Sequence, residues 1–485
     1  MSAGPNVLWI FCDELRADAI ACYGNEYAKI ATPAIDSIAA AGTRFDRFYV
    51  NSPVCVPSRA AYLTGQLPTR TGIYHNEGLF LPDPAGPRSF VEQFRDAGYL
   101  AVSLGKEHVP RGLRGFDISD ADGASQIELM IEAGAHRNEL DVVAEAIGMH
   151  SGTFPSDVPY PPDKLTDHAL RWLHNDRPED QLWLLRVSYL QPHTPVVVPE
   201  PWASRYDSEP WPDEFGPDAG LSGYERAFAA AADSQDLTPA EIVAAQSCYQ
   251  GLVSWIDDQV QRLLGAVDDL GLRENTIVVF ASDHGAQLGE LGGAYGKMTF
   301  SHWSHRVPFI VSWPGHVPAG EVRPELAQSV DFGPTLCDLI GLDAATDIDG
   351  RRLFTDPAPD TVSSAIGYGN PSSRALAMLD RGDFLGSGWP QRFCVRTERW
   401  RYDRSTRADG ALLDESDQDR FLADGHSDPR EEHNVVDHPA HAGVVAELEE
   451  ALSLHVAGAV QTQPDDYALW RTSLRQHLAE QLKGL

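Results

Sequence analysis

The sequence predicts an α/β protein whose core is a large, doubly wound, mixed but mostly parallel sheet sandwiched by helices. Short apolar runs alternate with helical patterns along most of the chain, and polar residues follow directly behind each run. Such runs are typical of buried parallel strands, which bring their carboxyl ends together at one edge of a sheet. A length of 485 residues suits one big domain with a smaller one beside it.

The first part of the chain shows this pattern twice. Residues 7–11 form an apolar run that is followed closely by Asp13. Residues 32–42, T-P-A-I-D-S-I-A-A-A-G, begin with a threonine cap and a proline and stop at a glycine, which predicts a helix. The order of helix, glycine stop and strand recurs over residues 89–105. The polar segment G-K-E-H at 105–108 is therefore expected at the same edge as Asp13.

Two further segments repeat the arrangement. Residues 182–190 predict a strand that leads into the loop Q-P-H-T-P around His193, whose prolines favour extended backbone. A long amphipathic helix is predicted over residues 238–271, and residues 275–282 then form a buried strand that ends at Asp283. Polar side chains again follow the carboxyl ends of strands, which indicates one site beyond the sheet.

A domain boundary is expected where the chain becomes rich in Asp, Pro, Thr and Gly, at residues 343–360. We place an N-terminal catalytic domain at residues 1–355 and a C-terminal subdomain at residues 356–485. The strand pattern R-F-C-V-R-T-E-R-W-R-Y at 392–402 and the helical pattern at 444–454 predict that the subdomain is a small antiparallel α+β unit.

The charge balance excludes several classes of partner. With 38 lysines and arginines against 71 aspartates and glutamates, the formal net charge is −33. Such a chain repels nucleic acids and anionic membranes, so neither is an expected partner. A small anionic substrate would need a local cluster of cations. Lysine is scarce and occurs only at Lys29, Lys106, Lys164, Lys297 and Lys483.

Neither a targeting signal nor a disulfide framework is indicated. The N-terminus has no basic segment ahead of its short apolar run, and no segment approaches about 18 uninterrupted apolar residues. A cytoplasmic protein is therefore expected.

The cysteines lack C-x-x-C spacing, which argues against a zinc ribbon or paired disulfides. They are Cys12, Cys22, Cys55, Cys248, Cys337 and Cys394.

Cys55 has the most informative surroundings of the six. It lies in N-S-P-V-C-V-P-S-R-A-A-Y-L-T-G at 51–65, two residues before Pro57 and four before Arg59. A cysteine considered alone is compatible with three roles: a buried small hydrophobe, a thiol nucleophile, or a precursor of another functional group.

The segment C-V-P-S-R-A-A-Y-L-T-G resembles the sulfatase signature C-x-P-S-R-x-x-x-L-T-G. The resemblance continues in the right order over nearly the whole chain, in D-E-L-R at 13–16, G-K-E-H at 105–108, Q-P-H-T-P at 191–195, S-D-H-G at 282–285, G-K-M-T-F-S-H-W-S-H-R-V-P at 296–308 and S-D-P-R-E-E-H-N-V-V at 427–436. The chain is similar to the formylglycine-dependent sulfatases of the alkaline phosphatase superfamily, including arylsulfatases, choline-sulfatase-like enzymes and phosphonate monoester hydrolases. This resemblance implies an alkaline-phosphatase-like fold.

The resemblance implies that Cys55 is oxidised to formylglycine (3-oxoalanine) by a formylglycine-generating enzyme that reads C-x-P-x-R. An aldehyde hydrates to a geminal diol, so one oxygen can attack sulfur while the other later expels sulfate. A serine at this position would leave a stable sulfate ester. Arg59 would neutralise the charged intermediate and hold the loop.

The resemblance also implies a metal site made by Asp13, Asp283, His284 and the oxygen that replaces the thiol of Cys55. Oxygen-rich coordination makes Ca²⁺ the expected ion. An imidazole ligand suits Mn²⁺ or Zn²⁺ better, and Mg²⁺ is a further alternative. Glu14 stands where many sulfatases have another aspartate ligand, and its added methylene leaves it outside the expected ligand set.

The remaining matched residues are Lys106, His108, His193 and Lys297, which correspond to the family's sulfate-binding and proton-transfer residues. His108 would deprotonate the diol for sulfate release. His193 and Lys297 would bind sulfate oxygens and protonate or stabilise the leaving alkoxide. The sequence departs from the family pattern at His302, where relatives usually have Glu or Asp.

The expected activity is hydrolysis of a sulfate ester of a small organic alcohol, phenol or sugar. Phosphonate monoester hydrolysis or phosphodiester hydrolysis with the same site is one open alternative. A catalytically silent binding protein with unconverted Cys55 is another, and the complete set of matched residues argues against it. The acidic chain favours a small or singly sulfated substrate.

Several stretches are expected to shape the pocket for the alcohol. They are residues 120–165 and 201–238, which resemble insertions or lids, and residues 361–392. The helical pattern after D-Y-A-L-W at 466–470 offers an interface for a homo-oligomer.

Overall fold

The structure, a computed structural model, describes residues 4–24, 30–76, 88–120, 151–154, 156–157, 159–194, 196–206, 222, 225, 238–290, 295–343, 345–367, 391–406 and 420–459. Much of the three stretches expected to shape the alcohol pocket lies outside these residues, and so does the helical pattern after residues 466–470. Those expectations stay predictions.

The main sheet has eight strands in the order β12-β2-β11-β8-β1-β6-β3-β4. These strands are β1 (Asn6–Asp13), β2 (Thr43–Tyr49), β3 (Leu100–Gly105), β4 (Ile118–Asp120), β6 (Trp183–Pro192), β8 (Thr276–Ser282), β11 (Phe309–Ser312) and β12 (Glu321–Gln328). All neighbours from β8 to β4 pair in parallel, as do β12 and β2, whereas β11 is antiparallel to both of its neighbours. The predicted mixed, mostly parallel sheet is confirmed.

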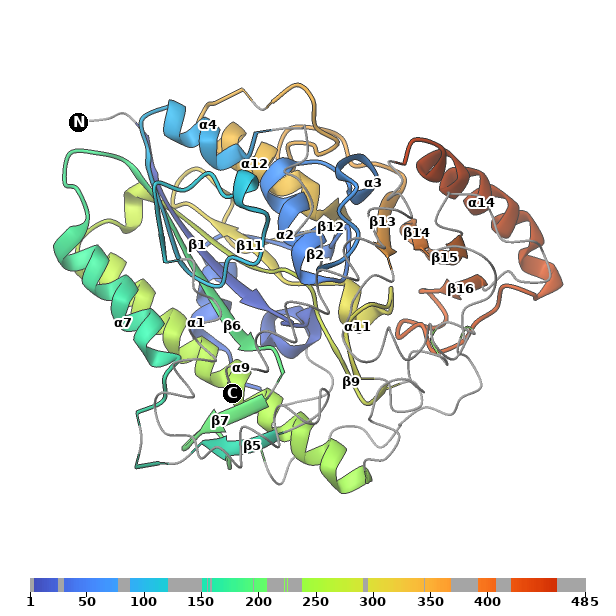
Figure 1. The fold of residues 1–485 in the computed structure, drawn as a ribbon, viewed down its shortest axis with the longest axis horizontal. Coiled ribbons are helices and arrows are strands. Elements are labelled where there is room, and N and C mark those ends of the chain that lie inside the picture. Colours follow the sequence, from blue (N-terminus) through green and yellow to red (C-terminus); the bar gives the residue numbers. More distant parts are fainter. Residues whose placement is uncertain are drawn as a thin grey trace, which may run out of the picture.

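Helices cover both faces of this sheet (Figure 1). One face packs against α1 (Pro33–Ala40), α7 (Asp163–Arg171) and α9 (Pro239–Asp269). The other face packs against α2 (Cys55–Thr64), α4 (Phe90–Asp96) and α12 (Phe332–Leu339). The short helices α3 (Pro68–Thr71) and α11 (His302–His305) lie in the connections.

The central strand β1 shows why its sequence is a continuous apolar run. Leu8 and Ile10 join the core beneath α1 and α9, whereas Val7, Trp9 and Phe11 join the core beneath α2 and α12. Side chains alternate between the two faces of a strand, and here both faces are buried. An apolar residue is therefore favoured at every position, which is what the sequence predicts.

The predicted start of α1 is confirmed, with Thr32 at the N-cap position and Pro33 as the first helical residue, but the threonine side chain does not cap the helix. Thr32 makes no side-chain hydrogen bond to the helix amides, and its hydroxyl donates to Asp36 Oδ1 at 3.2 Å. The amides of Ala34 and Ile35 instead donate to the carboxylate of Asp257 in α9, at 3.2 and 2.9 Å. A carboxylate from a distant helix satisfies the orphan amides, and local sequence does not reveal such a partner.

A small antiparallel sheet lies beside the main one (Figure 1). Its strands, in spatial and chain order, are β13 (Val362–Gly367), β14 (Gln391–Arg396), β15 (Trp400–Thr406) and β16 (Arg420–Asp424). Helix α14 (Ala442–Ala457) packs on one of its faces through Leu448 and Leu452. The predicted antiparallel α+β unit is confirmed.

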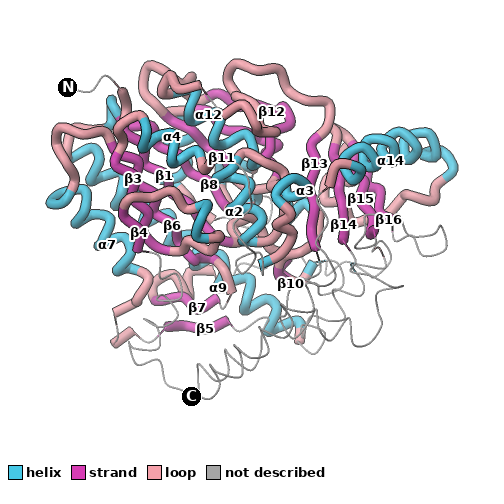
Figure 2. Tube along the Cα trace, turned by 45° about the horizontal axis from the view of Figure 1, so that its top comes forward, coloured by secondary structure: helices cyan, strands magenta, loops and turns pink. Residues whose placement is uncertain are grey.

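Two further pairs of strands lie outside these two sheets. β5 (Ser151–Phe154) pairs in parallel with β7 (Val196–Pro199), and Figure 2 shows this pair apart from the small sheet. β9 (Gln287–Leu288) pairs with β10 (Tyr295–Gly296).

The strands of the main sheet fall between residues 6 and 328 and those of the small sheet between 362 and 424. The proposed division at residue 355 stays a prediction. All six cysteines are free. No helix in the described part of the chain combines the length and apolarity that crossing a bilayer requires.

Candidate active site

Four adjacent parallel strands bring the predicted residues to one edge of the main sheet. Asp13 ends β1, Lys106 follows β3, Asp283 follows β8, and His193 directly follows β6. Cys55 opens the first turn of α2 and is 1% exposed. The arrangement follows from the sheet itself, since parallel neighbours end on the same side.

Cationic side chains surround the sulfur of Cys55. Lys297 Nζ lies 3.0 Å from Sγ, His284 Nε2 lies 3.2 Å from it and Lys106 Nζ lies 3.8 Å from it. Burial alone would raise the pKa of the thiol, but these neighbours lower that pKa well below its usual value. A position that stabilises negative charge suits a nucleophilic group better than an inert apolar cysteine.

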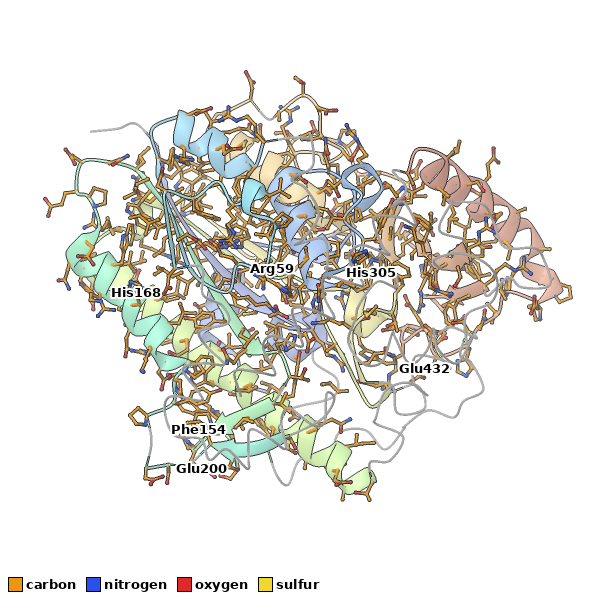
Figure 3. The ribbon with its side chains drawn as sticks, in the orientation of Figure 1. Arg59, Phe154, His168, Glu200, His305 and Glu432 are labelled. Carbon is orange, nitrogen blue, oxygen red and sulfur yellow. The ribbon has the colours of Figure 1, made fainter. Side chains whose placement is uncertain are left out.

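Arg59 ties the two aspartates of the site together. Its Nε donates to Asp283 Oδ2 at 2.8 Å, and its Nη2 donates to Asp13 Oδ2 at 3.0 Å. Its Nη1 donates to the carbonyl of Lys106 at 2.9 Å and to Ser188 Oγ at 3.0 Å. The guanidinium is buried at the centre of the molecule, where Figure 3 labels it. Its planar fork of donors suits this task better than a lysine would.

A group of potential metal ligands lies next to Arg59. Asp13, Cys55, Asp283 and His284 each offer one ligand atom, and these atoms lie within 4.8 Å of one another. His284 Nδ1 is 2.8 Å from the carbonyl of Gly285, so its proton can reside there and leave Nε2 facing Cys55. With an oxygen on residue 55, this donor set fits a divalent cation.

The electrostatics of this group also favour a cation. Burial and the charge of Asp13 raise the pKa of the Asp283 carboxyl to about 6. Burial alone would raise the pKa of Asp13 as well, but Lys106 and other cations lower it. Burial opposes a charge on His284, yet Asp283 and Cys55 raise its pKa to about 9. Acidic groups this close together are stabilised by positive charge between them.

A second corner of the site contains Lys297, His193 and Glu14. Lys297 Nζ lies 2.8 Å from His193 Nε2 and 2.9 Å from Glu14 Oε1. Burial would lower the pKa of Lys297, but Cys55 and Glu14 raise it well above its usual value. The ammonium is therefore charged, and it contacts both the residue 55 position and a histidine.

His108 lies on another side of Cys55. It interacts with the thiol, and its Nδ1 is buried without a hydrogen-bond partner among the described residues. Its φ of 45° lies in the left-handed region, which disfavours residues with a side chain. Burial, assisted by the charge of Lys106, lowers the pKa of His108. A neutral imidazole in this place can accept a proton.

The family model described as Sulfatase matches residues 5–342, a range that includes every predicted site residue. The chain belongs to the sulfatase family.

Curated relatives of this sulfatase-family chain are named sulfatases, and a solved structure shares its fold. The choline-sulfatase of Rhizobium meliloti (strain 1021) is 28% identical over 359 residues, which are 70% of this chain and 68% of that protein. The N-acetylgalactosamine-6-sulfatase of Sus scrofa is 29% identical over 384 residues, 72% of this chain and 65% of that protein. The crystal structure of the phosphonate monoester hydrolase of Agrobacterium radiobacter shares the fold, with a TM-score of 0.73 at 23% identity over 95% of this chain and 100% of that one.

Glu14 is a residue of this sulfatase site that sequence reasoning left out. Its carboxylate contacts Lys297 at 2.9 Å and His193 at 3.3 Å, and it is 2% exposed. Glu14 also forms a possible ligand group with Asp13 and His193. The ammonium of Lys297 already supplies positive charge to that group. The acidic pair D-E behind the first strand was the available signal.

His302 is the other departure from the sulfatase pattern, and its described hydrogen-bonding contact is with Arg306. Its Nε2 is 3.3 Å from Arg306 Nη1, and burial together with the charge of Arg306 lowers its pKa to about 4. Nothing in its contacts assigns it a part in the chemistry.

The sequence analysis also did not single out Ser188, whose hydroxyl lies inside the apolar run of β6 and accepts a hydrogen bond from Arg59.

Proposed function

We propose that this chain is a sulfatase that hydrolyses the sulfate ester of a small organic alcohol, phenol or sugar, with formylglycine formed from Cys55 as its nucleophile. One observation carries the proposal: the ammonium groups of Lys297 and Lys106 lie 3.0 and 3.8 Å from the sulfur of Cys55. Charge builds up on the oxygens of a sulfate ester in the transition state, so fixed cations at this point favour the reaction.

A divalent metal ion would be held by Asp13, Asp283, His284 and the oxygen of residue 55. Ca²⁺ is the ion we expect first, with Mn²⁺ and Mg²⁺ as alternatives. It would supply positive charge beside the nucleophile. The role of Arg59 is then to hold both carboxylates in position, which its hydrogen bonds of 2.8 and 3.0 Å support.

The proton transfers would be divided among the histidines and Lys297. A geminal diol at residue 55 has one oxygen that attacks sulfur, which breaks the bond to the alcohol oxygen. It has a second oxygen that, once deprotonated, expels sulfate and restores the aldehyde. His193 with Lys297 would protonate or stabilise the leaving alkoxide, Lys106 would bind a sulfate oxygen, and neutral His108 would remove the proton of the second hydroxyl.

The nucleophile is tested by mass spectrometry of the peptide that contains residue 55. In protein made together with a formylglycine-generating enzyme, we expect formylglycine in place of cysteine and sulfate release in proportion to the converted fraction. Cys55→Ser is the matched control, because a serine would stop at a stable sulfate ester after one turnover. Full activity of the unmodified thiol would overturn the assignment.

The reaction class is tested with an aryl sulfate, an aryl phosphonate monoester and a bis-aryl phosphate. We expect the highest kcat/KM for the sulfate. A value more than about tenfold higher for either phosphorus substrate would instead assign the site to phosphonate monoester or phosphodiester hydrolysis. A panel of sulfated sugars, cholines, steroids and phenols would then identify the alcohol.

A further inference from the structure

Glu107 lies between two residues of the site, but the described contacts of its side chain are all with residues outside the site. In the segment G-K-E-H, Lys106 and His108 flank it on either side and both interact with the thiol. Glu107 itself is fully buried, at 0% exposure. A buried carboxylate needs partners that balance its charge.

Those partners form a polar cluster behind the site. Glu107 Oε2 lies 2.8 Å from Arg114 Nη1, as a close ion pair that is not aligned as a hydrogen bond. Its Oε1 accepts a hydrogen bond from Ser119 Oγ at the edge strand β4 and lies 4.0 Å from Arg186 Nη2 in β6. The carboxylate is thus held between the segment after β3 and two strands of the main sheet.

The carboxylate of Glu107 helps to balance the buried charge of Arg186. It is fully buried, its Nε and Nη2 donate to Ser103 Oγ at 3.0 and 2.7 Å, and its guanidinium lies 5.3 and 4.5 Å from the ring centres of Trp9 and Phe116. Burial lowers the pKa of Arg186, and Glu107 is the acid that raises it. Removal of one member of such a pair leaves an uncompensated buried charge.

The cluster and the site together hold the backbone on both sides of His108. Arg114 Nε donates to the carbonyl of Val109 at 3.5 Å while its Nη1 contacts Glu107. From the side of the site, Arg59 Nη1 donates to the carbonyl of Lys106 at 2.9 Å. The positive φ of His108, 45°, persists only where its surroundings fix it, and these contacts do so.

We propose that Glu107 is a positioning residue: through Arg114 and Arg186 its carboxylate fixes the strained turn that aims Lys106 and His108 at residue 55. The inference rests on the proposed function, because it assumes that these two side chains act there on a sulfate ester. A shift of about 1 Å in either side chain would slow the reaction without abolishing substrate binding.

The test compares Glu107→Ala and Glu107→Gln with the unchanged protein, all with residue 55 converted. Asp257→Ala is the matched control, because Asp257 is another buried carboxylate, 6% exposed, whose described contacts are with the amides of α1. At a temperature well below unfolding, we expect Glu107→Ala to lower kcat for an aryl sulfate by about 10- to 100-fold, with KM within about threefold.

Glu107→Gln keeps the shape and the contact to Ser119, so its loss of kcat should be smaller. If Glu107→Ala does not fold, Glu107→Gln is compared with Asp257→Asn in the same way. An unchanged kcat in the folded Glu107 variant, or an equal loss in the Asp257 variant, would overturn the inference.

A structural readout separates this inference from the proposed function. We expect the crystal structure of a Glu107 variant to show a changed φ at His108 and a Lys106 ammonium moved away from its place 3.8 Å from the Cys55 sulfur. An unchanged turn would overturn the positioning role, whatever the activity. Absence of sulfate release from the unchanged, converted protein would instead overturn the proposed function, and the structural comparison would still decide the role of Glu107.

Discussion

The ammonium of Lys297 lies 2.8 Å from Nε2 of His193. The same ammonium lies 3.0 Å from the sulfur of Cys55, so a single cation links the residue 55 position to the histidine expected at the leaving group. The Nδ1 atom of His193 is 2.5 Å from the carbonyl of Thr194, which fixes the orientation of the ring. We therefore expect Lys297 and His193 to act as a pair rather than as independent groups.

The first prediction concerns the leaving group. His193→Ala is expected to lower kcat/KM by about 100- to 1,000-fold for alkyl sulfates but by less than about tenfold for an activated aryl sulfate. The difference arises because a phenolate of low pKa leaves without a proton, whereas an alkoxide does not. This difference is measured by plotting the rates for a series of sulfate esters against the pKa of the leaving alcohol. His168→Ala in α7, well away from Arg59 in Figure 3, is the control. An equal loss for all esters would contradict the assignment.

The second prediction concerns Glu14 and the metal. Glu14→Ala is expected to retain bound metal, because the carboxylate of Glu14 contacts Lys297 at 2.9 Å and His193 at 3.3 Å. Asp283→Ala is expected to lose most of its metal, since Asp283 belongs to the four-residue ligand group. Elemental analysis of both dialysed variants measures how much metal each one retains. Metal loss from Glu14→Ala would make Glu14 a ligand.

The sequence predicts which residues lie together at this edge because chemistry and topology coincide there. Asp13, Lys106, His193 and Asp283 all follow apolar strands, and parallel strands of one sheet place such residues at a common edge. The signature around Cys55 adds the residue that completes the group, whereas the helix α2 that begins there is known only from the structure. No knowledge of side-chain direction is needed for these expectations.

What the sequence does not predict are contacts between side chains from distant segments. Asp257 caps α1 from 222 and 223 residues away along the chain, and Thr32 is the residue that a local pattern selects for that role. Glu107 has two functional neighbours in sequence, yet its own partners come from β4, β6 and the segment around Arg114. Such pairings depend on the packing of the complete fold.

The third prediction concerns Arg59→Lys. The donors of Arg59 are spread over three nitrogens and reach Asp13, Asp283 and the Lys106 carbonyl, which the single nitrogen of a lysine cannot span. Two buried carboxylates would therefore lose hydrogen bonds that balance their negative charge. We expect the free energy of unfolding to fall by about 3 kcal/mol, as measured by urea denaturation of the unconverted protein. Mass spectrometry of residue 55 must accompany any activity measurement, because Arg59 is also part of the C-x-P-x-R signal. A change below about 1 kcal/mol would show that the pairings contribute little.

The fourth prediction concerns the junction between the two sheets. Arg396 in β14 donates to the carbonyl of Phe300 at 2.5 Å and to Glu431 Oε2 at 2.8 Å, and it is 3% exposed. Arg396→Ala would leave Glu431 buried without its main partner, and we expect a loss of about 3 to 5 kcal/mol in the free energy of unfolding. The control is Arg47→Ala, whose exposed pair with Glu398 should contribute no more than about 1 kcal/mol. If urea denaturation shows the same loss of unfolding free energy for Arg396→Ala and Arg47→Ala, the prediction is wrong.

The last prediction uses His305, which lies at the same junction and is labelled in Figure 3. Its Nε2 donates toward the carbonyl of Val50 at 2.8 Å, and its Nδ1 accepts from Arg396 Nε at 2.8 Å, which together define a neutral imidazole. Burial and the charges of Arg396 and Arg401 lower the pKa of His305 well below its usual value. His302 is the other titratable group that contributes to this shift. The folded state therefore keeps His305 neutral where an unfolded chain would protonate it.

The sign of the resulting pH dependence follows from proton binding. Below about pH 6.5 the unfolded chain binds a proton at residue 305 that the folded chain does not, so the free energy of unfolding falls as the pH falls. Between pH 7.5 and 5.5 this one group should account for about 1.4 kcal/mol of the loss. His305→Gln cannot be protonated, so its urea-denaturation free energy should change by about 1.4 kcal/mol less than that of the unchanged protein over the same range. The variant is expected to be less stable at both pH values because its hydrogen bonds are altered, and only the difference in pH dependence tests the prediction. The same pH dependence in both proteins would mean that His305 is protonated in the folded state as readily as in the unfolded one.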